Sequence, residues 1–188
     1  MSELTQILER VAHGDPKAAA GLFPLVYEEL RHLAAQKMAG EASGHTLQPT
    51  ALVHEAWIRL GGNDAPTFRS RAHFFGAAAE AMRRILIEHA RRRLAAKRGA
   101  GVEVVDLDGI DIPYPLGEDD RLLAVNEALE KLALVDERKA ELVKLRFFVG
   151  LNFEEAAAAL GIAVPTAKQW WAYARAWLTV AVRDAAAR

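Results

Sequence analysis

The chain has 188 residues, of which 52% are hydrophobic and 26% charged, and its formal net charge is −1 at pH 7. This length and apolar content suit a globular protein of one large or two small domains. Cysteine is absent, which excludes disulfide frameworks and thiolate metal sites. No basic segment leads into an apolar one at the N-terminus and no long uncharged apolar run follows, so we expect a cytoplasmic protein that does not enter a membrane.

Helical patterns fill the first third of the chain. After a short first helix, Asp15 opens a second helix that Pro24 should kink. A third helix starts at Pro49 and stops at two glycines, 61 and 62. Its spacing turns five apolar residues inward: Leu52, Val53, Ala56, Trp57 and Leu60. Its outer side carries His54, Glu55, Ile58 and Arg59.

The next segment, NDAPTFRSRAHFF, is predicted to be a loop in which basic and aromatic residues alternate. It carries Phe68, Arg69, Arg71, His73 and Phe74. Such a mixture suits single-stranded nucleic acid, since cations follow the phosphates and rings stack on unpaired bases. Two aromatic residues that anchor a loop to a core would give the same pattern, so both interpretations stay open.

Residues 74–98 form the longest predicted helix, apolar on one side and increasingly basic toward its end. The apolar side is Phe75, Ala78, Ala79, Met82, Ile85, Leu86, Ala90 and Leu94. The other side carries Glu80, Arg83, Arg84, Glu88, Arg91 and Arg92, and the last turns add Arg93, Lys97 and Arg98. A basic stripe in a nearly neutral chain indicates a polyanionic partner. A solvated face with internal salt bridges is the alternative.

An acidic linker is predicted over 99–117, GAGVEVVDLDGIDIPYPLG, which contains acids, glycines and prolines but no cation. It divides the chain into two helical domains, 1–98 and 118–188. The acids between Glu103 and Asp111 also suggest a hypothesis, in which they lie against the basic stripe and compete with DNA for it.

The second unit ends in a short helix, a glycine turn and a longer helix. A first helix covers about 119–135, Asp136 caps the next, and Gly150 ends it. Asn152 and Glu155 form a capping-box pattern for the short helix, after which Gly161 makes the turn. This is the layout of a helix-turn-helix, whose second helix enters the major groove of DNA. Its exposed side is predicted to be Thr166, Lys168, Gln169, Ala172, Tyr173 and Arg175.

Taken together, these segments resemble the bacterial RNA polymerase sigma factors of the extracytoplasmic-function (ECF) group. LQPTALVHEAWIRL looks like the family's polymerase-binding helix, and FRSRAHFFGAAAEAMRRILIEHARRR looks like the segment that melts and reads the minus-ten promoter element. The helix-turn-helix domain looks like the reader of the minus-thirty-five element. The chain departs from the family before the last helix, where Ala163 and Val164 replace the usual Ser or Thr cap and Ala167 replaces a valine.

The resemblance implies an all-α fold and three sets of binding residues. Polymerase would contact Leu52, His54, Glu55, Trp57, Ile58 and Arg59. The minus-ten strand would contact Phe68, Arg69, His73, Phe74, Arg83, Arg84, Arg91 and Arg92. The upstream duplex would contact the exposed side of the last helix. The implied partners are core RNA polymerase and promoter DNA, and the sequence leaves open whether an anti-sigma factor is a third.

The expected function is binding rather than catalysis, with no cofactor or metal. The chain has no HExxH, no glycine-rich phosphate loop and no nucleophile elbow. The alternative function is a free-standing helix-turn-helix regulator that binds duplex DNA alone. That alternative explains the second half of the chain but assigns no task to the basic helix or to the loop before it.

Overall fold

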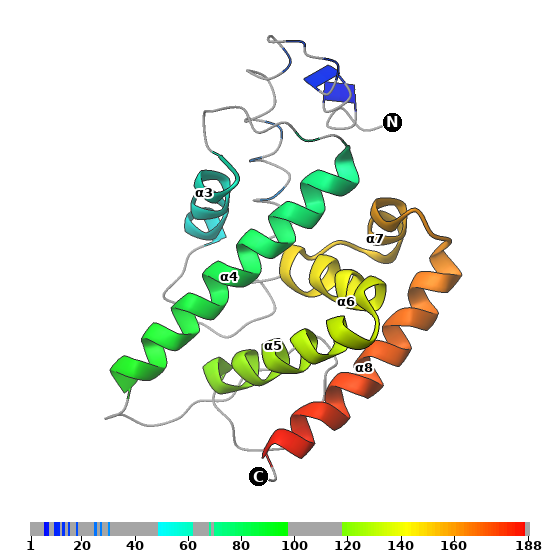
Figure 1. The fold of residues 1–188 in the computed structure, drawn as a ribbon. Coiled ribbons are helices and arrows are strands. Elements are labelled where there is room, and N and C mark those ends of the chain that lie inside the picture. The colour runs from blue at the N-terminus through cyan, green and yellow to red at the C-terminus, as the bar shows by residue number, and fades with distance from the viewer. Residues whose placement is uncertain are drawn as a thin grey trace.

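The computed structural model describes residues 49–61, 68, 70–97 and 118–186, together with scattered positions between 6 and 30. Every regular element in this part of the chain is helical, so the predicted all-α fold is confirmed (Figure 1). The kink predicted at Pro24 and the linker predicted over 99–117 lie outside the described residues. None of the described helices is long and apolar enough to cross a membrane.

Helices α3 (Pro49–Arg59) and α4 (Arg71–Lys97) form the first half. α3 ends as predicted, because Gly61 adopts a positive φ of 113°. α4 begins earlier than the predicted position 74. The Ser70 hydroxyl accepts a hydrogen bond from the backbone amide of His73 at 3.1 Å and caps the first turn. His73 and Phe74 therefore belong to the helix and not to the preceding loop.

Helices α5 (Glu118–Val135) and α6 (Glu137–Lys144) follow, and the Asp136 side chain caps α6 by accepting from the amide of Lys139 at 3.0 Å. The predicted continuous helix to Gly150 is wrong in one respect. After Lys144 the chain widens into a π-helical turn, η1 (Leu145–Val149), before Gly150 ends it in the left-handed conformation. Phe147 and Phe148 are both buried in this turn. The sequence does not signal the wider turn.

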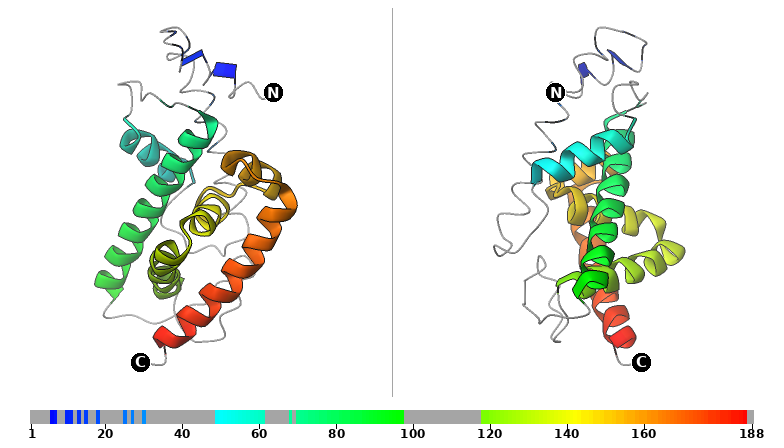
Figure 2. Two further views of the ribbon diagram at one scale, coloured as in Figure 1. Left: turned by 45° about the vertical axis from the view of Figure 1, so that its right-hand side comes forward. Right: turned by 90° about the vertical axis from the view of Figure 1, so that its left-hand side faces the viewer.

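Helix α4 lies at the centre of the arrangement (Figures 1 and 2). α3 packs against one side of it, and α5, α6, η1 and α7 (Phe153–Leu160) pack against others. α8 (Val164–Ala186) closes the assembly against α5, α6 and α7. The two sequence-predicted units thus pack on each other through α4, although their division into separate domains stays a prediction.

Two apolar clusters form the core. The first joins α3 and α4 with side chains of α6, η1, α7 and the start of α8, including Phe75, Met82 and Leu142. The second joins α5, α6, η1 and the rest of α8. Leu86 and Trp171 pack against both clusters. The apolar stripe predicted for α4 is confirmed. Six of its eight residues are buried: Phe75, Ala78, Ala79, Met82, Ile85 and Ala90. The other two, Leu86 and Leu94, are half-buried.

Candidate nucleic-acid interface

Helices α7 and α8 form the predicted helix-turn-helix. The capping box is present, because Asn152 Oδ1 accepts from the Glu155 amide and Glu155 Oε2 accepts from the Asn152 amide, both at 2.8 Å. Gly161 ends α7 at φ 63°, a left-handed conformation that favours glycine. Ala157 and Ala167 are buried where the two helices approach each other. At the start of α8 the Ala167 amide donates to the Ala163 carbonyl at 3.0 Å.

The N-terminal half of α8 presents most of the predicted DNA-binding side chains to solvent. Five of them are exposed: Lys168, Gln169, Ala172, Tyr173 and Arg175. Thr166 is half-buried. On the opposite side Ala174 and Leu178 are buried in the second core cluster. One side of the helix is thus fixed to the core, and the other presents hydrogen-bonding groups.

The aromatic residues before and at the start of α4 are core residues, which corrects the single-strand interpretation for Phe68 and Phe74. Their side chains are 4% and 0% exposed. Their rings meet edge to face with centroids 5.1 Å apart, and Phe75 packs on Phe74 at 5.2 Å. The anchoring interpretation therefore holds for these two residues in this conformation. His73 is exposed and contacts the Phe68 ring edge to face at 5.8 Å, while Arg69 lies outside the described residues.

Three of the four predicted DNA-binding arginines of α4 are on its surface: Arg84, Arg91 and Arg92. The side chains of Arg84 and Arg92 are each 65% exposed, and each pairs with a carboxylate four residues earlier, Glu80 at 2.8 Å and Glu88 at 3.5 Å. Such exposed pairs are weak and are readily exchanged for phosphate partners. These cations therefore remain available to a polyanion.

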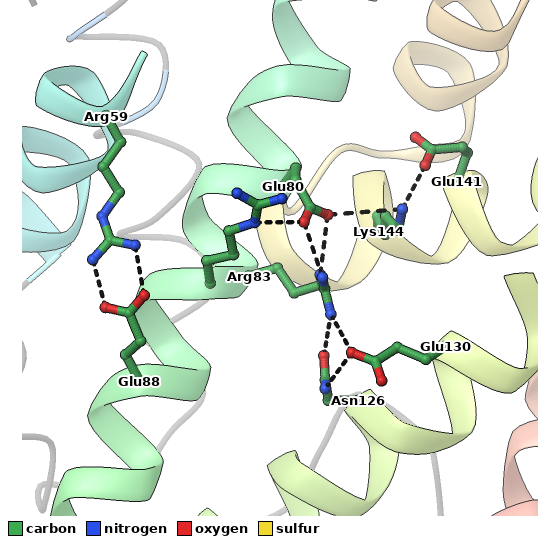
Figure 3. A network of polar contacts seen from close by, with 9 residues as sticks. Arg59, Glu80, Arg83, Glu88, Asn126, Glu130, Glu141 and Lys144 are labelled. Carbon is green, nitrogen blue, oxygen red and sulfur yellow. Dashed lines mark hydrogen bonds and ion pairs between the residues drawn. The ribbon is translucent and has the colours of Figure 1, made fainter. Parts of the chain in front are cut away.

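Arg83 differs, and its predicted place on the open surface is wrong. Its side chain is 15% exposed and lies between α4 and α5 (Figure 3). It donates to Glu80 at 2.9 and 3.1 Å, to Glu130 at 3.3 Å, and to Asn126. The hydrogen bond to Glu80 raises the pKa of Arg83 against the opposing effect of burial. Lys144 adds a contact to Glu80 at 3.8 Å.

The outer side of α3 is held to α4 by a second polar network. Arg59 binds both carboxylate oxygens of Glu88, at 2.9 and 2.6 Å (Figure 3). It also binds Glu55 of its own helix at 2.8 Å. His89 lies 3.5 Å from Glu55. His54 and Ile58 are exposed, with Ile58 58% accessible.

Leu52 and Trp57, by contrast, are 3% and 6% exposed and belong to the core. Their predicted direct contact with polymerase is not possible in this packing. The outward-facing part of the predicted polymerase surface is therefore His54, Glu55, Ile58 and Arg59.

A comparison with protein-family models matches the chain to the ECF sigma factor model over residues 1–184. This match spans nearly the whole chain and includes both halves of the fold. The chain belongs to the ECF sigma factor family. Members act in transcription initiation, a role that implies RNA polymerase and promoter DNA as partners. None of the curated proteins compared with the chain matches it significantly.

In this sigma factor, cations of α6 lie over two aromatic residues of α8, an arrangement that was not predicted from the sequence. Arg138 and Lys139 lie over the Trp170 ring at 5.1 and 5.4 Å, and Lys139 also lies 5.1 Å from the Tyr173 ring. Such contacts fix the orientation of a ring. The sequence signals this aromatic pair only by placing a Trp and a Tyr three residues apart on one helix, where they share a side.

Arg146 makes similar cation–π contacts near the start of α7. Its guanidinium lies 3.7 Å from the centroid of the Phe153 ring and 4.8 Å from that of Trp171. Its Nη1 donates to the Leu151 carbonyl at 3.1 Å. The first turn of the helix-turn-helix is thereby tied to η1.

Proposed function

We propose that this ECF sigma factor binds core RNA polymerase, directs it to specific promoters and assists promoter opening. The observation that carries the proposal is the combination of the family match over 1–184 with an outward-facing polar side on α8. Each of the three tasks uses a different surface. All three surfaces work by binding, and none requires a reactive group.

The upstream duplex is read by α8. Lys168 suits the acceptors of guanine and Gln169 suits the paired donor and acceptor of adenine. Tyr173 is 47% exposed and offers a hydroxyl, whereas Ala172 offers apolar contact of the kind made to a thymine methyl group. Arg175, three residues beyond Ala172, is exposed and contacts a phosphate. Thr166 lies at the entry of the helix and contributes a hydroxyl.

The minus-ten strand follows the basic surface of α4. Arg84, Arg91 and Arg92 neutralise phosphates there, and His73 and Arg69 act near the start of the helix. Phe68 and Phe74 support this region from inside the core. Binding of the separated strand offsets an opening cost of about 1.4 kcal/mol per base-pair step.

Core RNA polymerase docks on the outer side of α3, where His54, Glu55, Ile58 and Arg59 are accessible. An exposed isoleucine among charged residues supports this docking, because interface centres combine an apolar anchor with a polar rim. An anti-sigma factor, whose existence the sequence leaves open, would compete for the same kinds of surface.

The test is co-elution of the purified chain with bacterial core RNA polymerase. The variant Ile58→Glu places a charge in the proposed docking surface. Val180→Glu on α8 is the matched control, because Ile58 and Val180 are both 58% exposed and receive the same change. We expect the wild-type chain and the Val180→Glu variant to co-elute with polymerase. We expect the Ile58→Glu variant to elute separately from polymerase, although its circular dichroism spectrum shows that it is folded.

A different outcome of this experiment would support a different function for the chain. If no version of the chain associates with polymerase while the chain alone binds duplex DNA tightly, the protein is a free-standing regulator. In that case the docking role of α3 is withdrawn.

A further inference from the structure

We propose that Lys139 of α6 is a positioning residue for promoter recognition, which holds the Tyr173 ring of α8 in the orientation that reads one base pair. This inference rests on the proposed function, because it concerns how α8 reads the upstream duplex. It assigns part of the sequence preference to a side chain that acts through another residue rather than by contacting DNA. The two helices involved, α6 and α8, pack against each other (Figure 1).

Tyr173 reads DNA with a long side chain that burial does not fix. It is 47% exposed and lies one helical turn beyond Gln169. A side chain that moves freely in the unbound protein loses conformational entropy when DNA fixes it, and this loss lowers affinity. A ring that is already oriented before DNA binds avoids the loss and presents its hydroxyl at one place.

The ammonium group of Lys139 supplies that orientation. Its Nζ lies 5.1 Å from the centroid of the Tyr173 ring and 5.4 Å from that of Trp170. Both distances are within the range of about 6 Å over which the face of an aromatic ring attracts a cation. Trp170 and Tyr173 are three residues apart and share one side of α8, so one cation contacts both rings.

Lys139 is itself held in place. The Asp136 carboxylate accepts a hydrogen bond from the Lys139 backbone amide at 3.0 Å and also pairs with its ammonium group. The Lys139 side chain is 21% exposed, and the buried residues Ala140 and Val143 fix this part of α6 to the core. The cation therefore has a set position relative to α8.

Arg138 strengthens the same arrangement from the neighbouring position. Its guanidinium lies 5.1 Å from the centroid of the Trp170 ring, and its Nη2 donates to the Leu160 carbonyl at 3.2 Å. Leu160 is the last residue of α7, directly before the Gly161 turn. The start of α6 is thus connected both to the turn and to the helix that reads DNA.

Two effects of Lys139 on DNA binding can be told apart. Loss of a positioning cation reduces discrimination at the base pair that Tyr173 reads and leaves the phosphate contacts as they are. Loss of a cation that binds phosphate lowers the affinity for every sequence and makes the salt dependence shallower. Titrations at several salt concentrations separate the two effects.

The experiment uses the full chain bound to core RNA polymerase, and a promoter duplex that this complex enriches from a pool with a randomised upstream element. Lys139→Met removes the charge and keeps a long side chain. Lys131→Met, at an exposed position of α5, makes the same change of net charge and is the matched control. Lys139→Arg keeps a cation that stacks on rings and tests for rescue. Each complex is titrated with the duplex and with its single base-pair variants.

We expect Lys139→Met to lower the affinity ratio between the preferred and the substituted base pair about 2- to 5-fold at one position. This is the effect of one exposed cation–π contact, expressed as a ratio of equilibrium constants. Lys131→Met and Lys139→Arg should keep the wild-type ratio. Tyr173→Phe keeps the ring but removes the hydroxyl, so Lys139→Met should lower the ratio no further when it is added to Tyr173→Phe.

Three results would overturn the proposal. The first is equal ratios for Lys139→Met and Lys131→Met. The second is a uniform loss of affinity with a salt slope shallower by about 0.9, which would make Lys139 a phosphate contact. The third is an undiminished effect of Lys139→Met in the Tyr173→Phe background, which would exclude the Tyr173 hydroxyl as the group that Lys139 positions.

Folding and the proposed function are checked separately. Urea unfolding tests each variant, and Lys139→Gln, whose amide can still donate to Asp136, replaces Lys139→Met if that variant unfolds. A wild-type complex that enriches no upstream sequence would overturn the proposed reading of the duplex by α8, and this inference with it. Equal ratios on a duplex that the wild-type complex does enrich would overturn this inference alone.

Discussion

Arg59 at the end of α3 holds Glu88 in the middle of α4 through both carboxylate oxygens, at 2.9 and 2.6 Å. This bidentate pair connects the proposed polymerase surface to the basic helix. The hydrogen bond from Arg59 lowers the pKa of Glu88 below its ordinary value of 4.5. Folding therefore favours the carboxylate form of this side chain.

Glu88→Gln should lower the free energy of unfolding by about 0.2–1 kcal/mol at pH 7, the range for exposed ion pairs. The contribution is complete above the ordinary carboxyl pKa of 4.5 and is lost as the pH falls through the lower pKa of the folded state. Urea unfolding at neutral and at acidic pH measures the difference. Glu127→Gln, at an exposed position of α5, is the control. A difference that persists fully in acid would contradict the ion-pair explanation.

Two glycines should respond to alanine in opposite directions. A Cβ at Gly161 or at Gly76 would meet nothing within 4 Å, so space does not decide either case. Gly161 has φ 63°, where alanine is strained, and Gly161→Ala should destabilise by about 1–2 kcal/mol. Gly76 lies inside α4, where alanine should stabilise by about 0.5–1 kcal/mol. Thermal unfolding of both variants checks the signs.

Phe74→Ala should act on folding rather than on strand capture. The ring is fully buried between Phe68 and Phe75, and removal of such a ring costs about 3–5 kcal/mol. His73→Ala changes an exposed neighbour and should leave the unfolding midpoint nearly unchanged. Urea unfolding compares them. If the Phe74 variant keeps its stability but loses permanganate reactivity at the minus-ten element, the ring acts on DNA and the core assignment fails.

Arg91 and Gln169 should differ in how they affect DNA binding. Arg91→Ala should weaken binding to all sequences and make the salt dependence shallower by about 1. Gln169→Ala should relax preference at one base pair by about 1–3 kcal/mol and leave the salt slope nearly unchanged. Titrations of promoter duplexes with single base changes measure both effects. A uniform loss for Gln169→Ala would remove it from base readout.

Features that depend on local sequence were predictable. The apolar stripe of α4, the Asp136 cap, the Asn152 capping box and the Gly161 turn all rest on residues within a few positions of each other. Periodicity and capping chemistry specify such features without knowledge of the rest of the fold. The exposed side of α8 was predictable for the same reason.

Features that depend on a distant partner were not predictable. Arg83 has the same sequence surroundings as Arg84, yet only Arg83 meets α5. Phe68 and Phe74 fit two interpretations until the packing of α4 is known. The π-helical turn after Lys144 has no local signal, because it satisfies the packing of Phe147 and Phe148 rather than a propensity.

The central position of α4 has a consequence for the nascent chain on the ribosome. α4 is complete at Lys97, whereas α5 starts at Glu118 and η1 at Leu145. Its apolar side and its arginine stripe therefore emerge well before the helices that cover them, and late contacts of this kind slow folding. We expect the N-terminal half to stay loosely packed during translation and to become rigid only once the helix-turn-helix has been synthesised.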